Sequence, residues 1–156
     1  MAMIVNHQRA VRIRTTALET YSKRVAKLVK LPADSLTICF VENREIARWN
    51  RDYRGKKGPT DVLSFPIQGT NRHRPRRARS KEFFSAETPS VLYVGDIAIS
   101  PEIAKRNAAR FGRTVDAELR ILILHGMLHL LGFDHETDHG EMDRREAWLR
   151  RQLGLG

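Results

Sequence analysis

The chain has 156 residues, 41% of them apolar and 29% charged, so it is long enough to bury one hydrophobic core and too short to suggest two domains. We therefore expect a single domain over residues 1–156. The longest uninterrupted apolar run, Met1 to Val5, is far below the roughly 18 residues that cross a bilayer, so we expect a cytoplasmic protein with no membrane partner. Cys39 is the only cysteine, which excludes an intramolecular disulfide and a cysteine-cluster metal site.

The formal net charge of +10 favours a polyanionic partner such as RNA, DNA or an anionic surface. This charge is unevenly distributed, because residues 117–156 hold only 5 Lys/Arg against 7 Asp/Glu. We expect the basic surface and the acidic carboxyl-terminal part to serve different purposes. The alternative is that the basic surface does no more than keep the protein solvated.

The first half of the chain predicts two strands and two helices after a short first strand at residues 3–5. Thr16 and Glu19 have the spacing of a capping box, which predicts a helix that runs to about Leu31 and stops at Pro32. The remaining elements of this half are a strand over 35–41, a helix from Asn43 to about Tyr53 and a strand over 61–66.

The second half begins with residues 69–90, which lack periodicity and hold no acidic residue before Glu82, so we predict a long, mobile basic loop. A strand over 91–99, a helix over 101–111, a central buried helix over 114–131 and a last helix that ends before Gly154 follow. The fold class we predict is α/β (α+β), a roughly four-stranded mixed sheet packed with about five helices. The order of the strands stays open.

Two histidines lie on one face of the predicted central helix. His125 and His129 are four residues apart, so their side chains project about one turn apart and are able to share a metal ion. A helix stop at Gly132 lets the chain turn back, and His135 follows three residues later. Three neutral imidazoles leave one coordination position open, as in catalytic zinc sites with a bound water. We therefore predict one Zn²⁺ per chain, held by His125, His129 and His135.

Other interpretations of these histidines stay open. A histidine pair in an apolar helix also occurs where the rings are hydrogen-bonded core groups. A closed structural zinc site needs a fourth protein ligand, for which Asp134, Asp138 and His139 are the nearby candidates. Asp134 is alternatively an acceptor for the N–H of a metal-bound histidine, or it only caps its loop.

The same histidine spacing occurs in metalloproteases of the metzincin type, where a glutamate directly after the first histidine acts as the general base. Here that position is Gly126, so peptide hydrolysis by this route lacks its base and is the minor alternative. Phosphodiester hydrolysis has different needs, because a metal ion and an arginine together stabilise the extra negative charge on the phosphate oxygens.

Arg54 is the arginine we select for this role. It lies at the end of a predicted helix, and Lys56 and Lys57 directly after it would make the entry to the site basic. The alternative is that Arg54 pairs with a carboxylate or with the carboxyl terminus of its own helix.

Three segments of the chain together resemble the YbeY family of bacterial endoribonucleases. They are the sequences YRGK and PTDVLSFP in residues 53–66, GDIAIS in residues 95–100, and HGMLHLLGFDH in residues 125–135. Two departures are Asp61, where the family more often has asparagine, and the length of the loop over 69–90.

The resemblance implies a zinc-dependent, single-strand-specific endoribonuclease that acts in ribosomal RNA maturation, including the small-subunit 3′ end, and in ribosome quality control. It also implies that His125, His129 and His135 bind zinc and that Arg54 is the essential arginine. Single-stranded RNA, ribosomal RNA and the ribosome are the expected partners. The candidate RNA-binding residues are Lys56, Lys57, Arg72, Arg74, Arg76 and Arg77. The alternative of another class is a non-catalytic, zinc-stabilised module that binds RNA or the ribosome.

Overall fold

The computed structural model describes residues 3–67, 93–133 and 139–155, and within these ranges it has one four-stranded sheet and five α-helices. The predicted α/β class with a mixed sheet is therefore confirmed. The elements are β1 (Ile4–His7), α1 (Thr15–Leu28), the short 3₁₀ helix η1 (Ala33–Ser35), β2 (Leu36–Val41), α2 (Asn43–Arg54), β3 (Val62–Pro66), β4 (Gly95–Ile99), α3 (Pro101–Phe111), α4 (Val115–Leu130) and α5 (Glu141–Leu153).

The strand order, which the sequence left open, is β1-β2-β4-β3. β1, β2 and β4 are parallel, while β3 is an edge strand that runs antiparallel to β4 and pairs Pro66 with Gly95. The pairing of β3 with β4 continues beyond the strands, because the N–H of Ile67 donates to the carbonyl of Val94 at 2.9 Å. Ile67 and Val94 therefore lie side by side at the same end of β3 and β4.

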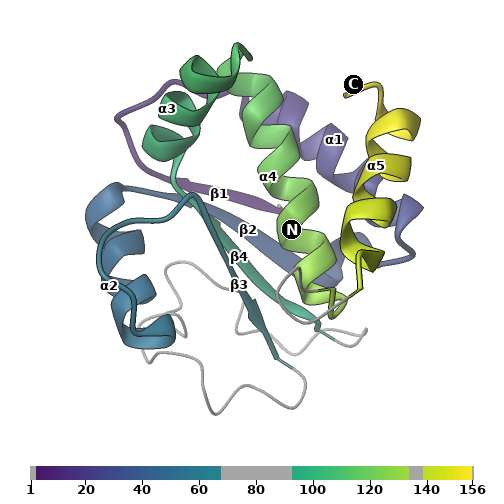
Figure 1. Cartoon of the computed structure of the whole chain (residues 1–156), viewed down its shortest axis with the longest axis horizontal. Helices are drawn as coiled ribbons and strands as arrows, with labels where there is room; N and C mark the ends of the chain where they lie inside the picture. Colours follow the sequence, from purple (N-terminus) through teal and green to yellow (C-terminus); the bar gives the residue numbers. More distant parts are fainter. Residues whose placement is uncertain (1–2, 68–92, 134–138, 156) are drawn as a thin grey trace.

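The two faces of the sheet carry cores of different size. Helices α1, α3, α4 and α5 pack on one face, where they bury the larger cluster with Ile38, Ile97 and Ile99 of the sheet. Among the described helices, only α2 covers the other face, with Trp49 packed edge-on to Phe65 at 6.0 Å between ring centroids. Figure 1 shows α4 in front of the sheet, with α5 beside it and α2 separate from both.

Helix α4 is the buried central helix that the sequence predicted. Its first turn is capped by the hydroxyl of Thr114, which accepts a hydrogen bond from the N–H of Ala117 at 3.0 Å. Gly126 brings the helix close to the sheet, since a Cβ at this position would stand 2.6 Å from Cγ2 of Ile97. The hydroxyl of Ser64 on β3 donates to the carbonyl of Gly126 at 3.1 Å, so the middle of α4 is fixed against β3 and β4.

The predicted capping box of the first helix is wrong. Helix α1 begins at Thr15, with Arg14 at the cap position and no side-chain hydrogen bond to the cap. The carboxylate of Glu19 instead accepts hydrogen bonds from the backbone N–H groups of Met3 and Ile4. A tertiary contact with the first strand has taken the side chain that local spacing assigned to the helix end.

Other predicted helix boundaries are confirmed. Ser100 caps α3 by accepting from the N–H of Ile103 at 3.2 Å, and Pro101 is its first residue. Helix α5 ends at Leu153, with Gly154 in the left-handed conformation. The predicted loop over residues 69–90 and the candidate zinc ligand Asp138 lie outside the described residues. In the part of the chain that the structure describes, no helix is long and apolar enough to cross a membrane.

Candidate active site

His125 and His129 lie on one face of the second half of α4, and both side chains are half-buried. Their four-residue spacing places the two rings one turn apart, as expected from the sequence. His129 is in the last turn of the helix, after which the chain turns at Gly132 with a φ of +96°. The described chain therefore presents a pair of imidazoles at the end of a helix that is rigidly packed on the sheet.

The carboxylate of Glu146 on α5 contacts the Nε2 atom of His125. The same carboxylate accepts the Arg150 guanidinium at 2.7 Å, one turn further along α5. The side chain of Glu146 is only 12% exposed, so these contacts are largely withdrawn from water. The sequence analysis missed Glu146, and the only local signal was its Glu-to-Arg spacing of four residues with Arg150.

The donor set fits a zinc ion as far as it is described. Neutral imidazoles are ordinary zinc ligands, and a histidine pair four residues apart on a helix is a common platform for one. The third predicted ligand, His135, and the candidate acceptor Asp134 lie outside the described residues. Within the described ranges, no group of three or more His, Cys, Asp or Glu side chains is placed to hold a metal ion. The described pair therefore needs at least one further ligand.

Arg54 is the last residue of α2, and its side chain is exposed. The helix stops there because Gly55 adopts the left-handed conformation at φ +67°. The side-chain amide of Asn50, which is buried, donates to the carbonyl of Gly58 at 2.9 Å and fixes the turn that follows. Arg54 forms no ion pair with any residue that the structure describes, so the alternative in which it pairs with a carboxylate receives no support there.

The ends of the helices that carry Arg54 and His129 lie at one end of the β3–β4 pair, on opposite faces of the sheet. Tyr53, which precedes Arg54, contacts Phe65 at 5.0 Å between ring centroids, and Phe65 lies near the end of β3. On the other face, Leu130 approaches Gly95 at the start of β4, where its Cδ2 atom would stand 2.8 Å from an added Cβ. Figure 1 shows that α2, β3 and α4 all end in the lower half of the view, with β3 between the two helices.

A buried acidic side chain lies at this same edge. Asp96 of β4 is fully buried, and its carboxylate accepts a hydrogen bond from the hydroxyl of Tyr93 at 2.5 Å. The Tyr93 hydroxyl is also 2.6 Å from the hydroxyl of Thr37 on β2. The network connects the second residues of β2 and β4 on the α2 face, and sequence patterns assigned it no role beyond the GDIAIS motif.

The other predicted RNA-binding residues divide between described and undescribed parts of the chain. Lys56 and Lys57 are exposed in the turn after α2, next to Arg54. Asp61 is not at that turn. It precedes β3 at the opposite end of the strand, where its carboxylate accepts from the side-chain amide of Asn107 at 3.3 Å. The residues Arg72, Arg74, Arg76 and Arg77 lie outside the described residues.

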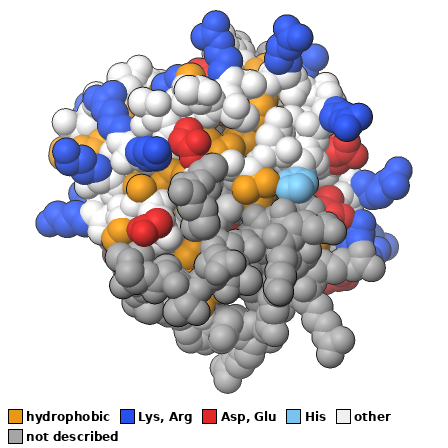
Figure 2. All heavy atoms as spheres, turned by 180° about the vertical axis from the view of Figure 1, so that it is seen from behind, with side chains coloured by type: hydrophobic (Ala, Val, Ile, Leu, Met, Phe, Trp, Pro, Cys, Tyr) orange, Lys and Arg blue, Asp and Glu red, His pale blue; other side chains and the backbone are white. Residues whose placement is uncertain are grey.

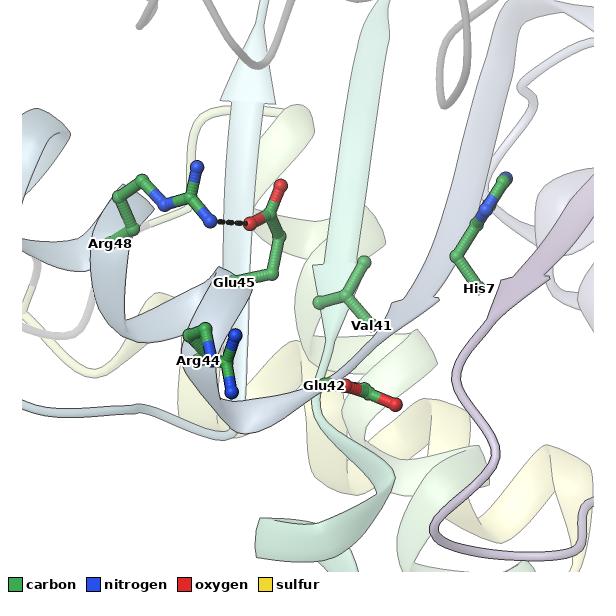
Figure 3. A pocket seen from close by; sticks show the side chains of 6 residues that line it. All are labelled: His7, Val41, Glu42, Arg44, Glu45 and Arg48. Carbon is green, nitrogen blue, oxygen red and sulfur yellow. Dashed lines mark ion pairs between the residues drawn. The ribbon is translucent and has the colours of Figure 1, made fainter.

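A surface pocket lies away from both histidines. Figure 3 shows that it is formed where β1 and β2 end and α2 begins, with His7 and Val41 on the sheet and Glu42, Arg44, Glu45 and Arg48 on the helix side. Arg48 and Glu45 form an ion pair at 2.6 Å across its wall. The lining carries both signs of charge, and neither Arg54 nor a histidine of α4 contributes to it.

The position of Gly126 removes the metalloprotease base for a structural reason. The missing Cβ points at Ile97 in the core and not toward the surface that His125 and His129 share. A glutamate at this position would have to displace the sheet before it reached any bound water. The structure therefore argues further against proteolysis by that route.

Comparison with known proteins gives one consistent result. The family model described as endoribonuclease YbeY matches residues 3–154. A protein named endoribonuclease YbeY from Solibacter usitatus is 39% identical over 145 residues, which are 92% of this chain and 82% of that protein. One of the same name from Geobacillus thermodenitrificans is 40% identical over 141 residues, 88% of this chain and 85% of the relative. A solution structure from Thermotoga maritima superposes with a TM-score of 0.58 at 25% identity, covering 98% of this chain and 89% of that one.

Proposed function

This chain belongs to the YbeY family of endoribonucleases, hydrolases that act on RNA, and we propose that it is a zinc-dependent, single-strand-specific member that matures ribosomal RNA. We assign it maturation of the small-subunit ribosomal RNA 3′ end and a role in ribosome quality control. We place this activity in the cytoplasm. The observation that supports the proposal is that Tyr53, next to Arg54, and Leu130, next to His129, lie at the same end of the β3–β4 pair on opposite faces of the sheet.

His125, His129 and His135 are the residues that would hold one zinc ion per chain. When bound, zinc would supply a Lewis acid beside the scissile phosphate. The role of α4 is to hold two of these imidazoles in a fixed orientation, because its middle is pinned by Gly126 and Ser64. Glu146 on α5 contacts the His125 ring and restrains its orientation. Asp134 is a further acceptor for a histidine N–H.

Arg54 would bind a phosphate oxygen and stabilise the negative charge that grows there during cleavage. Three features support this role: the guanidinium is exposed, it forms no ion pair within the described residues, and the Gly55 turn fixes the end of its helix. Lys56 and Lys57 would guide the strand to the same point. Arg72, Arg74, Arg76 and Arg77 would add affinity for ribosomal RNA by displacing counterions.

The test compares His129→Ala with His7→Ala on an RNA that has a duplex and a single-stranded overhang. We expect His129→Ala to lower the cleavage rate by at least about a hundredfold, because it removes an imidazole from the zinc site. His7→Ala is the matched control, since His7 is exposed at the far end of β1 and should leave the rate unchanged.

Metal analysis of the same preparations separates the enzyme from a zinc-stabilised binding module. One zinc per chain with an exchangeable water supports the enzyme. Four protein ligands, a domain that melts on chelation and wild-type cleavage by His129→Ala would together identify a binding module in its place.

A further inference from the structure

The most exposed large apolar side chain among the described residues is Phe111, at 56% exposure. It is the last residue of α3, and Gly112 ends the helix behind it in the left-handed conformation. Phe111 contributes to neither core cluster. A single exposed apolar side chain is common on soluble proteins, so what singles out Phe111 is the charge around it.

Two guanidinium groups stand over the Phe111 ring. The Cζ atoms of Arg110 and Arg113 lie 5.6 and 5.2 Å from the ring centroid. Arg113 is held in place by an ion pair with Glu118 at 2.9 Å, whereas Arg110 forms no ion pair with a described residue. The result is an aromatic ring and two planar cations in one small surface, which we call the Phe111 platform.

The basic charge extends from the platform along α3. Lys105 and Arg106 are exposed on the preceding turn and make no ion pair within the described residues. Arg106 and Arg110 are four residues apart, so they share one face of the helix. Charge alone does not locate a binding site on this molecule. Figure 2, which views the molecule from behind relative to Figure 1, shows lysines and arginines spread around the rim. The platform differs in combining such charge with an exposed ring.

A second exposed aromatic residue provides the contrast. Trp148 of α5 is 39% exposed, and the Arg145 guanidinium lies 5.2 Å from its ring. Arg144 and Arg151 lie on the same helix, so the charge around Trp148 is also basic. However, its ring is less exposed than that of Phe111 and only the Arg145 guanidinium, among the described residues, stands over it. The Phe111 platform therefore offers more accessible ring surface to a base than Trp148 does.

We propose that the Phe111 platform stacks a base of the single-stranded RNA substrate, while the cations of α3 contact the adjacent phosphates. Aromatic faces and arginine planes both accept an unstacked base, whatever its identity. This inference rests on RNA being the substrate and adds a binding site remote from the reacting phosphate.

The position of the platform agrees with a substrate that extends beyond the cleavage site. Helix α4 joins the two places, since it begins just after the platform and carries the histidines in its second half. At 1.5 Å per residue, His125 is about 15 Å from the start of the helix. A strand that spans this length would be bound at both ends of α4.

The test measures RNA binding by fluorescence anisotropy in the His129→Ala background, so that the RNA is not cut. Two probes of equal length are used, a single-stranded RNA and an oligonucleotide with the same phosphates but no bases. We expect Phe111→Ala to weaken binding of the RNA by about tenfold and to leave binding of the abasic probe unchanged. Arg110→Ala should weaken both probes, and Trp148→Ala neither.

Several results would overturn the inference. One is unchanged RNA binding by Phe111→Ala. Another is an equal loss of affinity for the RNA and the abasic probe, which would show that no base stacks on the ring. If polyglutamate bound as tightly as RNA and depended on Phe111, the platform would be a protein contact. In the cleavage-competent chain, Phe111→Ala should raise KM without lowering kcat. Failure of the proposed function appears separately, as wild-type cleavage by His129→Ala.

Discussion

The two ends of α4 handle charge in opposite ways. At its carboxyl-terminal end, His125 is tied to Glu146, and Glu146 to Arg150, in contacts that are largely shielded from water. Next to its amino-terminal end, Phe111 and Arg110 at the end of α3 are exposed, and Arg110 has no carboxylate partner among the described residues. Arg113 and Arg120 pair with Glu118 and Asp116 there, so what this end leaves accessible is one aromatic ring and one arginine.

This difference corresponds to two physical requirements. A group that takes part in chemistry must already point in the right direction, because reorganisation during the reaction raises the barrier. A group that gathers a flexible polyanion gains from exposure and from displaced counterions, and it needs less exact placement. These requirements fit a rigid end, which we propose for cleavage, and an open end, which we propose for binding.

The largest effect is expected for Arg54→Ala, at the end of α2. Loss of the guanidinium should lower kcat/KM for RNA cleavage by about a hundredfold, because the charge on the phosphate is no longer stabilised. Arg54→Lys should recover only part of this loss, since an ammonium lacks the planar fork. Arg51→Ala, an exposed arginine of the same helix, is the control. Wild-type cleavage by Arg54→Ala would remove Arg54 from the site.

Gly126→Ala is expected to reduce the free energy of unfolding by about 2 kcal/mol, because its methyl group overlaps Ile97 and pushes α4 off the sheet. Thermal or denaturant unfolding measures this change. Gly132→Ala gives the size of a purely conformational loss, since among the described residues nothing lies within 4 Å of its added Cβ and the positive φ alone opposes it. Wild-type stability of Gly126→Ala would show that close packing is not what Gly126 provides.

Glu146→Gln is expected to weaken zinc binding by about tenfold, because the ring of His125 loses the carboxylate that orients it. Competition with a chromogenic chelator gives the affinity, and unfolding of the metal-free protein reports the lost contacts. Asp143→Asn changes an exposed carboxylate on the same helix and serves as control. Tighter zinc binding by Glu146→Gln would mean that the carboxylate competes with the metal.

The smallest effect is expected at the open end. Thr114→Ala removes the hydroxyl that caps α4, which should cost about 1 kcal/mol of stability. Because the helix is pinned further along at Gly126, kcat should stay unchanged while the first turn frays. A fall in kcat equal to that of Arg54→Ala would show that the two ends of α4 are not independent.

Local sequence signals predicted much of the fold and failed where a tertiary contact competed. The helices predicted over 101–111 and 114–131 form where expected. Ser100 and Thr114 cap them by accepting hydrogen bonds from backbone N–H groups only three residues away. Glu19 was predicted to cap α1 and instead binds the backbone of β1, a contact that no local pattern contains. Strand order was equally beyond local reasoning, since β4 lies between β2 and β3.

The candidate site shows the same division. The spacing of His125 and His129 follows from helical geometry, so the amino-acid sequence alone predicted that the two rings share a face of α4. The contact of Glu146 with His125, and the position of the ends of α2 and α4 at one end of the β3–β4 pair, became visible with the packed chain. Caps and helix faces depend on neighbours within a turn or two, whereas contacts between elements depend on how the whole core packs.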